Sequence, residues 1–267
     1  MLDFLFSVRA IESIWLPASL AAALIAWSPQ LRRLSPTAPA IAIAFLFGFL
    51  LIRPFPIWPM VGAEGPIPYL ILPLLAIASM ADIPRVRIVA SLLFIIALPI
   101  LASLVIGRGT IGPLASGRGL LLYPLLALSG ALVFSRLIIM GERRAGGYAL
   151  LLPAIGLVLL AQGYGTRIWL LALPLASALA GALLATTRLD LRWPLSASLT
   201  AGGIWFFFAV LLIAKRDLLA LPTAILFLGF LAPSLADRLA PRRGGRHLAI
   251  ILLYGAAVVA LSRLSLP

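Results

Sequence analysis

Residues 237–246 read Asp-Arg-Leu-Ala-Pro-Arg-Arg-Gly-Gly-Arg, and this stretch carries four arginines between two long apolar segments. Membrane proteins retain their short arginine-rich loops on the cytoplasmic side, so the stretch predicts a cytoplasmic loop. A loop that is placed on one side of a membrane also fixes the direction of the helices on either side of it. Every earlier segment can then be oriented by counting back from residue 237.

The composition is typical of an integral membrane protein. Of the 267 residues, 63 % are hydrophobic and only 11 % are charged, whereas soluble domains contain about 25 % charged residues. A separate soluble domain of ordinary size would need about 100 residues, and the apolar runs leave no room for one. We therefore expect a single integral membrane domain over residues 1–267.

Twenty-one basic and eight acidic residues give the chain a formal net charge of +13. The basic residues are scattered in loops between apolar segments, which is typical of topology signals and of contacts with anionic lipid head groups. The expected partners are therefore the lipid bilayer and anionic lipid head groups, and not nucleic acid. Asp3 stands where a signal peptide would be basic and no clear cleavage site follows, so we expect the first apolar segment to be retained.

Apolar runs of about 17 residues or more predict an all-α, polytopic transmembrane bundle with short loops and about ten helices. The predicted ranges are 13–29, 38–57, 66–81, 88–106, 119–140, 146–163, 168–186, 194–214, 218–236 and 247–265. The first, third and sixth ranges are the weakest, so the count lies between eight and ten.

The distribution of charge between alternate loops orients these helices. The odd-numbered loops carry twelve basic residues: Arg32, Arg33, Arg85, Arg87, Arg143, Arg144, Arg188, Arg192, Arg238, Arg242, Arg243 and Arg246. The tails and even-numbered loops carry eight: Arg9, Arg53, Arg108, Arg118, Arg167, Lys215, Arg216 and Arg263. The positive-inside rule then places the odd-numbered loops in the cytoplasm and both termini outside.

Four arginines and one glutamate on the predicted outer face form the candidate site. Arg53, Glu64, Arg108, Arg118 and Arg167 all fall in outer loops. Because arginine binds phosphate and carboxylate through two parallel hydrogen bonds, these residues predict a groove for an anionic head group or a lipid-linked substrate. The competing interpretation is ordinary contact with lipid phosphates.

Prolines and tryptophans mark further features of the predicted helices. Prolines 73, 99, 153 and 174 lie inside apolar segments, where kinks can line a cavity but also occur without any transport role. Trp15, Trp27, Trp169 and Trp193 lie near predicted segment ends, where tryptophan anchors helices at the membrane interface. Trp205 lies deeper, so we expect it to contact lipid or packing partners and not a ligand.

The acidic residues all fall in loops or at predicted helix ends, which argues against a pump coupled through an intramembrane carboxylate. There is no cysteine, and His247 is the only histidine, so we expect no metal site, no cofactor and an interfacial role for His247. No nucleophile motif or general base is evident, so we do not expect an enzyme.

These observations favour a multi-pass inner (plasma) membrane protein that is permease-like or flippase-like and handles an anionic or lipid-linked substrate. The first alternative is a non-catalytic membrane subunit or scaffold that docks a membrane or cytoplasmic protein through its arginine loops. The second alternative is an integral membrane enzyme that acts on lipid phosphates.

Overall fold

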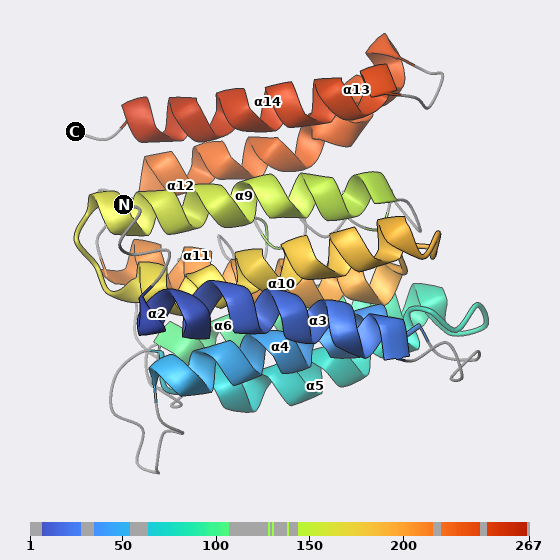
Figure 1. The fold of residues 1–267 in the computed structure, drawn as a ribbon, viewed down its shortest axis with the longest axis horizontal. Coiled ribbons are helices and arrows are strands. Elements are labelled where there is room, and N and C mark those ends of the chain that lie inside the picture. The colour runs from blue at the N-terminus through green and yellow to red at the C-terminus, as the bar shows by residue number, and fades with distance from the viewer. Residues whose placement is uncertain are drawn as a thin grey trace.

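The computed structural model describes residues 7–27, 35–53, 64–106, 144–215, 220–240 and 245–265, together with residues 128, 130 and 138. All regular structure in these residues is helical, which confirms the expected all-α fold for this part of the chain. Figure 1 shows the helices lying side by side along one direction, with their connections at the two ends of a bundle. The first helix begins and the last helix ends at the same end (Figure 1).

The described residues form nine continuous helical stretches. The first comprises α2 (Val8–Ala10), the π-helical turn η1 (Ile11–Trp15) and α3 (Leu16–Trp27). Seven are regular: α4 (Thr37–Ile52), α5 (Ile67–Met80), α6 (Arg87–Ile106), α9 (Arg144–Gly163), α10 (Ile168–Arg188), α11 (Leu195–Lys215) and α14 (Gly245–Leu264). The remaining one comprises α12 (Ala220–Phe227), the 3₁₀ turn η3 (Leu228–Leu231) and α13 (Ala232–Leu239).

Six helices in the described part of the chain are long and apolar enough to cross a membrane. They are Val8–Trp27, Arg87–Ile106, Gly146–Gly163, Ile168–Arg188, Leu195–Ala214 and Gly245–Leu264. α4 and α5 are apolar but shorter. These helices identify a membrane protein. The predicted helix 119–140 lies outside the described residues apart from positions 128, 130 and 138, so the total of about ten stays a prediction.

Two predicted segments differ from the helices that form. The segment 38–57 ends as a helix at Ile52, because Arg53 precedes Pro54 and a residue before proline avoids the helical conformation. The segment 218–236 is interrupted by η3. Pro233 has no N–H to donate to the carbonyl of Gly229, and that carbonyl instead accepts from the N–H of Ala232, which gives a 3₁₀ turn.

α11 is the central helix of the described bundle. Within its most apolar stretch 89 % of the residues are buried, against 28 % in the first helix and in α14. Trp205 is fully buried, its ring packs edge-on against Phe227 and Phe230, and its Nε1 donates a hydrogen bond of 3.0 Å to the carbonyl of Pro153. The expected packing role of Trp205 is confirmed.

The other described tryptophans differ in their exposure, and interfacial anchoring stays a prediction for those at the surface. Trp15 and Trp27 lie at the surface of the bundle. Trp193, which we expected at the interface, is fully buried, and its Nε1 donates a hydrogen bond of 2.9 Å to Ser198 Oγ. Proximity to a segment end is therefore not a sufficient signal for an interfacial position.

α3, α4 and α10 make a close three-helix contact through glycines. A Cβ atom at Gly48 of α4 would lie 2.5 Å from Cγ of Pro17 and 2.9 Å from Cβ of Pro174. A Cβ atom at Gly181 of α10 would lie 2.7 Å from the carbonyl carbon of Ala18 and closer still to its oxygen. Small residues let membrane helices approach closely where lipid provides no hydrophobic drive, so these glycines set the spacing of the three helices.

Candidate functional site

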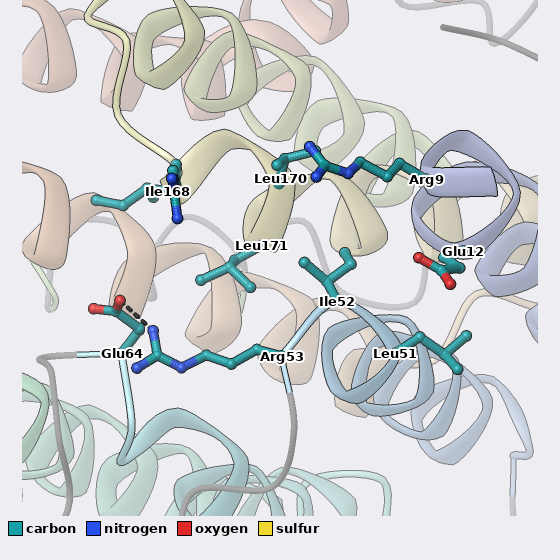
Figure 2. Close-up of a pocket in the computed structure, with 10 residues that line it drawn as sticks. Arg9, Glu12, Leu51, Ile52, Arg53, Glu64, Ile168, Leu170 and Leu171 are labelled. Atoms are coloured by element: carbon teal, nitrogen blue, oxygen red, sulfur yellow. Dashed lines mark hydrogen bonds and ion pairs between the residues drawn. The ribbon is translucent and has the colours of Figure 1, made fainter. Parts of the chain in front are cut away.

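A cavity of 460 Å³ opens at the end of the bundle where the first helix begins, α4 ends and α10 begins. This volume is within the range of small-molecule sites, about 300–1,000 Å³. The lining residues are Arg9, Glu12, Leu51, Ile52, Arg53, Glu64, Arg167, Ile168, Leu170 and Leu171 (Figure 2). Three arginines and two glutamates therefore share a small space with aliphatic side chains.

Arg9 and Glu12 lie in the first turns of the first helix, which begins earlier than the predicted residue 13. Ser7 caps this helix, because its Oγ accepts a hydrogen bond of 3.2 Å from the N–H of Ala10. The N–H of Leu16 then bonds to the carbonyl of Ile11, five residues back, which defines the π turn. Single π turns in α-helices occur frequently at functional sites.

The sequence explains this π turn locally. Pro17 has no N–H to donate to the carbonyl of Ser13, so the regular α-helical bonding is broken at this level. The hydroxyl of Ser13 is fully buried and donates a hydrogen bond of 2.6 Å to the carbonyl of Arg9. The π turn is therefore accompanied by a hydrogen bond from the side chain of Ser13 to the backbone of Arg9, which lines the cavity.

Arg53 and Glu64 form an ion pair across the floor of the cavity (Figure 2). Arg53 has an extended backbone, with φ −133° and ψ 120°, because it is followed by proline. The carbonyl of Glu64 accepts a hydrogen bond of 3.2 Å from the N–H of Ile67, the first residue of α5. The side chains of Arg53 and Glu64 are 30 % and 14 % exposed, so the pair is largely shielded from solvent.

Arg167 enters the cavity from the short connection between α9 and α10. Gly165 adopts φ +63°, a left-handed conformation that suits glycine after a helix end. The Oγ1 atom of Thr166 donates a hydrogen bond of 2.9 Å to the carbonyl of Ala161, which ties the connection back to α9. Arg167 follows directly and has an exposed side chain, which leaves it accessible to a ligand.

Three of the charged side chains in the cavity are not paired with an opposite charge in the described part of the chain and can therefore contact a ligand. Arg9, Glu12 and Arg167 form no ion pair with any residue that the structure describes. Figure 2 shows the guanidinium of Arg9 extending away from the carboxylate of Glu12, although the two residues are only one turn apart. With Arg53 and Glu64 engaged with each other, the remaining charges leave the cavity with one net positive charge.

The structure thus brings together Arg53, Glu64 and Arg167 of the five predicted site residues. Arg108 and Arg118 lie outside the described residues. Arg9 and Glu12 were not predicted as site residues, because both precede the first predicted helix, which begins at residue 13. Their signal in the sequence is a basic and an acidic residue three positions apart at the N-terminal end of an apolar segment.

The chemistry available in this cavity is anion binding. Guanidinium groups on one helix and at two positions outside the helices line the same cavity, and each can bind a phosphate or carboxylate through parallel hydrogen bonds. No group of three or more histidines and carboxylates within the described residues could hold a metal ion. Neither Pro153 nor Pro174 lines the cavity, because Pro153 packs against Gly229 and Pro174 against Gly48.

At the opposite end of the bundle the described residues hold a structural contact and an exposed basic surface. Asp82, in the connection between α5 and α6, caps α11 by accepting hydrogen bonds from the backbone N–H and the hydroxyl of Ser196, the former of 3.0 Å. Arg188 and Arg192 have exposed side chains here.

His247 is buried at the start of α14, and its Nε2 lies 3.9 Å from the carboxylate of Asp237.

Comparison with known proteins gives no family. The chain matches no family model, and no curated protein is significantly similar to it. The function must therefore be argued from the site itself.

Proposed function

We propose that this protein is a multi-pass inner-membrane permease, or a flippase-like protein, that binds an anionic or lipid-linked substrate in the cavity formed by Arg9, Glu12, Arg53, Glu64 and Arg167. The observation that carries the proposal is the convergence of three arginines from distant parts of the chain on one cavity of ligand size. In this proposal about ten helices span the membrane, both termini lie outside, and the cavity faces outward.

The Arg53–Glu64 ion pair supports a site that binds and releases its ligand. An anion that enters the cavity competes with Glu64 for the guanidinium of Arg53. The displaced carboxylate of Glu64, which is only 14 % exposed, then loses its partner, and this cost limits the affinity of the ligand and favours its release. Transport requires such reversible binding, because a carrier must release what it has bound.

Native mass spectrometry of the protein extracted gently from its own membrane tests the binding part of the proposal. We expect a bound anionic lipid or solute that is lost from Arg167→Gln and retained by Arg192→Gln, a matched change of an exposed arginine at the opposite end. A ligand that both variants retain equally would refute the assignment of the cavity. Flux of the identified ligand into proteoliposomes, compared for the same two variants, then tests transport.

The alternative of a non-catalytic subunit or scaffold has its own supporting observation. Arg85, Arg188, Arg192 and Arg238 have exposed side chains at the end of the bundle opposite the cavity. Such a basic surface suits an acidic partner protein as well as lipid head groups. In the same mass spectrometry experiment, a stoichiometric second chain that is lost on charge reversal of Arg188 and Arg192 would favour this alternative.

A further inference from the structure

Glu12 is the feature of the cavity that binding of a simple anion does not explain. A carboxylate repels an anion, yet Glu12 lines the same cavity as Arg9, Arg53 and Arg167. It is half-buried and forms no ion pair with a described residue. A ligand that fills the cavity removes this carboxylate further from water, and a cationic group on the ligand would offset that cost.

The geometry keeps the opposite charges apart. Residues three positions apart on a helix can pair across one turn, but the guanidinium of Arg9 extends away from Glu12 (Figure 2). Arg53 is engaged with Glu64 on another part of the wall. The cavity wall therefore holds an anionic group at Glu12 that is separate from the guanidinium of Arg9, and a further cationic residue, Arg167.

We infer that the ligand of this cavity is a zwitterion, with an amine a few bonds away from a phosphate or carboxylate. The inference rests on the proposed function and names its substrate class: the amine binds Glu12, and the anionic group binds Arg167 and Arg9. The aliphatic walls formed by Leu51 and Leu171 lower the local dielectric constant and strengthen both contacts. Ethanolamine lipid head groups and soluble amino phosphates share this chemistry.

A matched pair of probes tests the inference. 2-Aminoethyl phosphate and ethyl phosphate differ only in the amine, and phosphatidylethanolamine and phosphatidic acid in nanodiscs are the corresponding lipids. Binding of each pair to the detergent-purified or nanodisc protein is measured for wild type, Glu12→Gln, Glu12→Asp, Arg167→Gln and Arg192→Gln. The variants are first compared by size-exclusion profile and thermal unfolding.

We expect wild type and Arg192→Gln to bind the amine-containing probe about fivefold more tightly than its partner, the magnitude of one partly exposed charge pair. Glu12→Gln removes this preference, Glu12→Asp keeps part of it, and Arg167→Gln weakens both probes of a pair. A preference in the soluble pair identifies a soluble ligand, and a preference in the lipid pair alone identifies a lipid head group.

Two results would overturn the inference in distinguishable ways. Binding of both probes without preference, or a preference that survives Glu12→Gln, refutes the zwitterion while leaving the proposed anion site intact. Binding of no probe, or binding that Arg167→Gln does not weaken, refutes the proposed site together with the inference.

Discussion

Replacement of Gly181 by alanine should destabilise the bundle more than any other single methyl group added at a described glycine. The new Cβ would lie 2.7 Å from the carbonyl carbon and 2.8 Å from Cα of Ala18. Ordinary carbon–carbon contacts are about 3.5–4.0 Å. Since the obstacle is the backbone of α3 and not a movable side chain, α3 and α10 must separate by roughly 1 Å.

The magnitude follows from two opposing effects. Overpacking of a tight core costs about 1–3 kcal/mol, and a rigid backbone obstacle places Gly181→Ala near 3 kcal/mol. Alanine in a helix interior recovers about 0.5–1 kcal/mol relative to glycine. The free energy of unfolding should therefore fall by about 2 kcal/mol, which is roughly a thirtyfold change in the unfolding equilibrium.

Unfolding in mixed micelles of increasing SDS content, followed by tryptophan fluorescence, measures this change. Gly245→Ala is the control, because no atom lies within 4 Å of a Cβ at that position, and it should unfold within about 0.5 kcal/mol of wild type. Adding Ala18→Gly to Gly181→Ala should not restore stability, since the side chain of Ala18 is not the obstacle. Wild-type stability of Gly181→Ala, or rescue by Ala18→Gly, would refute the backbone contact.

Three further outcomes are expected. Asp82→Ala should lower the free energy of unfolding by about 1–2 kcal/mol because α11 loses its cap. Asp82→Asn should lower it less, because the amide oxygen can still accept a hydrogen bond. Titration with SDS measures the unfolding free energy of both variants. Trp205→Phe should cost about 1 kcal/mol through loss of the hydrogen bond to Pro153, measured in the same way. Because the chain has no cysteine, single cysteines at Arg167 and Arg192 can be labelled selectively, and an impermeant maleimide should reach position 167 from outside intact cells and position 192 only after lysis.

The positions of the described helices could be predicted from the sequence because a membrane-spanning helix needs a long apolar run. Their ends could not be predicted equally well, because hydrogen bonding of the backbone continues past the last apolar residue. The first helix therefore includes Arg9 and Glu12, which were expected to lie before it. Conversely, α4 ends at Ile52, because the proline after Arg53 stops the helix within an apolar run.

The candidate site could be predicted only in part for a related reason. Counting loops places Arg53, Glu64 and Arg167 at the same end of the bundle, but it does not say which helices are neighbours. That depends on the contacts of Gly48 and Gly181 with Pro17, Pro174 and Ala18. A small residue in an apolar helix predicts close packing without naming the partner helix, so the sequence could not show that these charges share one cavity.

Pro17 links the packing of the bundle to the geometry of the cavity. Its ring packs against Gly48 of α4, and its missing N–H accompanies the π turn that follows Arg9 and includes Glu12. A π turn holds one more residue than an α turn, and one residue corresponds to about 100° of rotation around the helix axis. Residues before the turn are thereby rotated relative to α3, so the same proline that fixes the spacing of two helices also sets the direction of the first-helix charges. The apolar face of the first helix can then stay packed on α4 and α10 while Arg9 and Glu12 face the cavity, a combination that a regular α-helix with the same contacts would not provide.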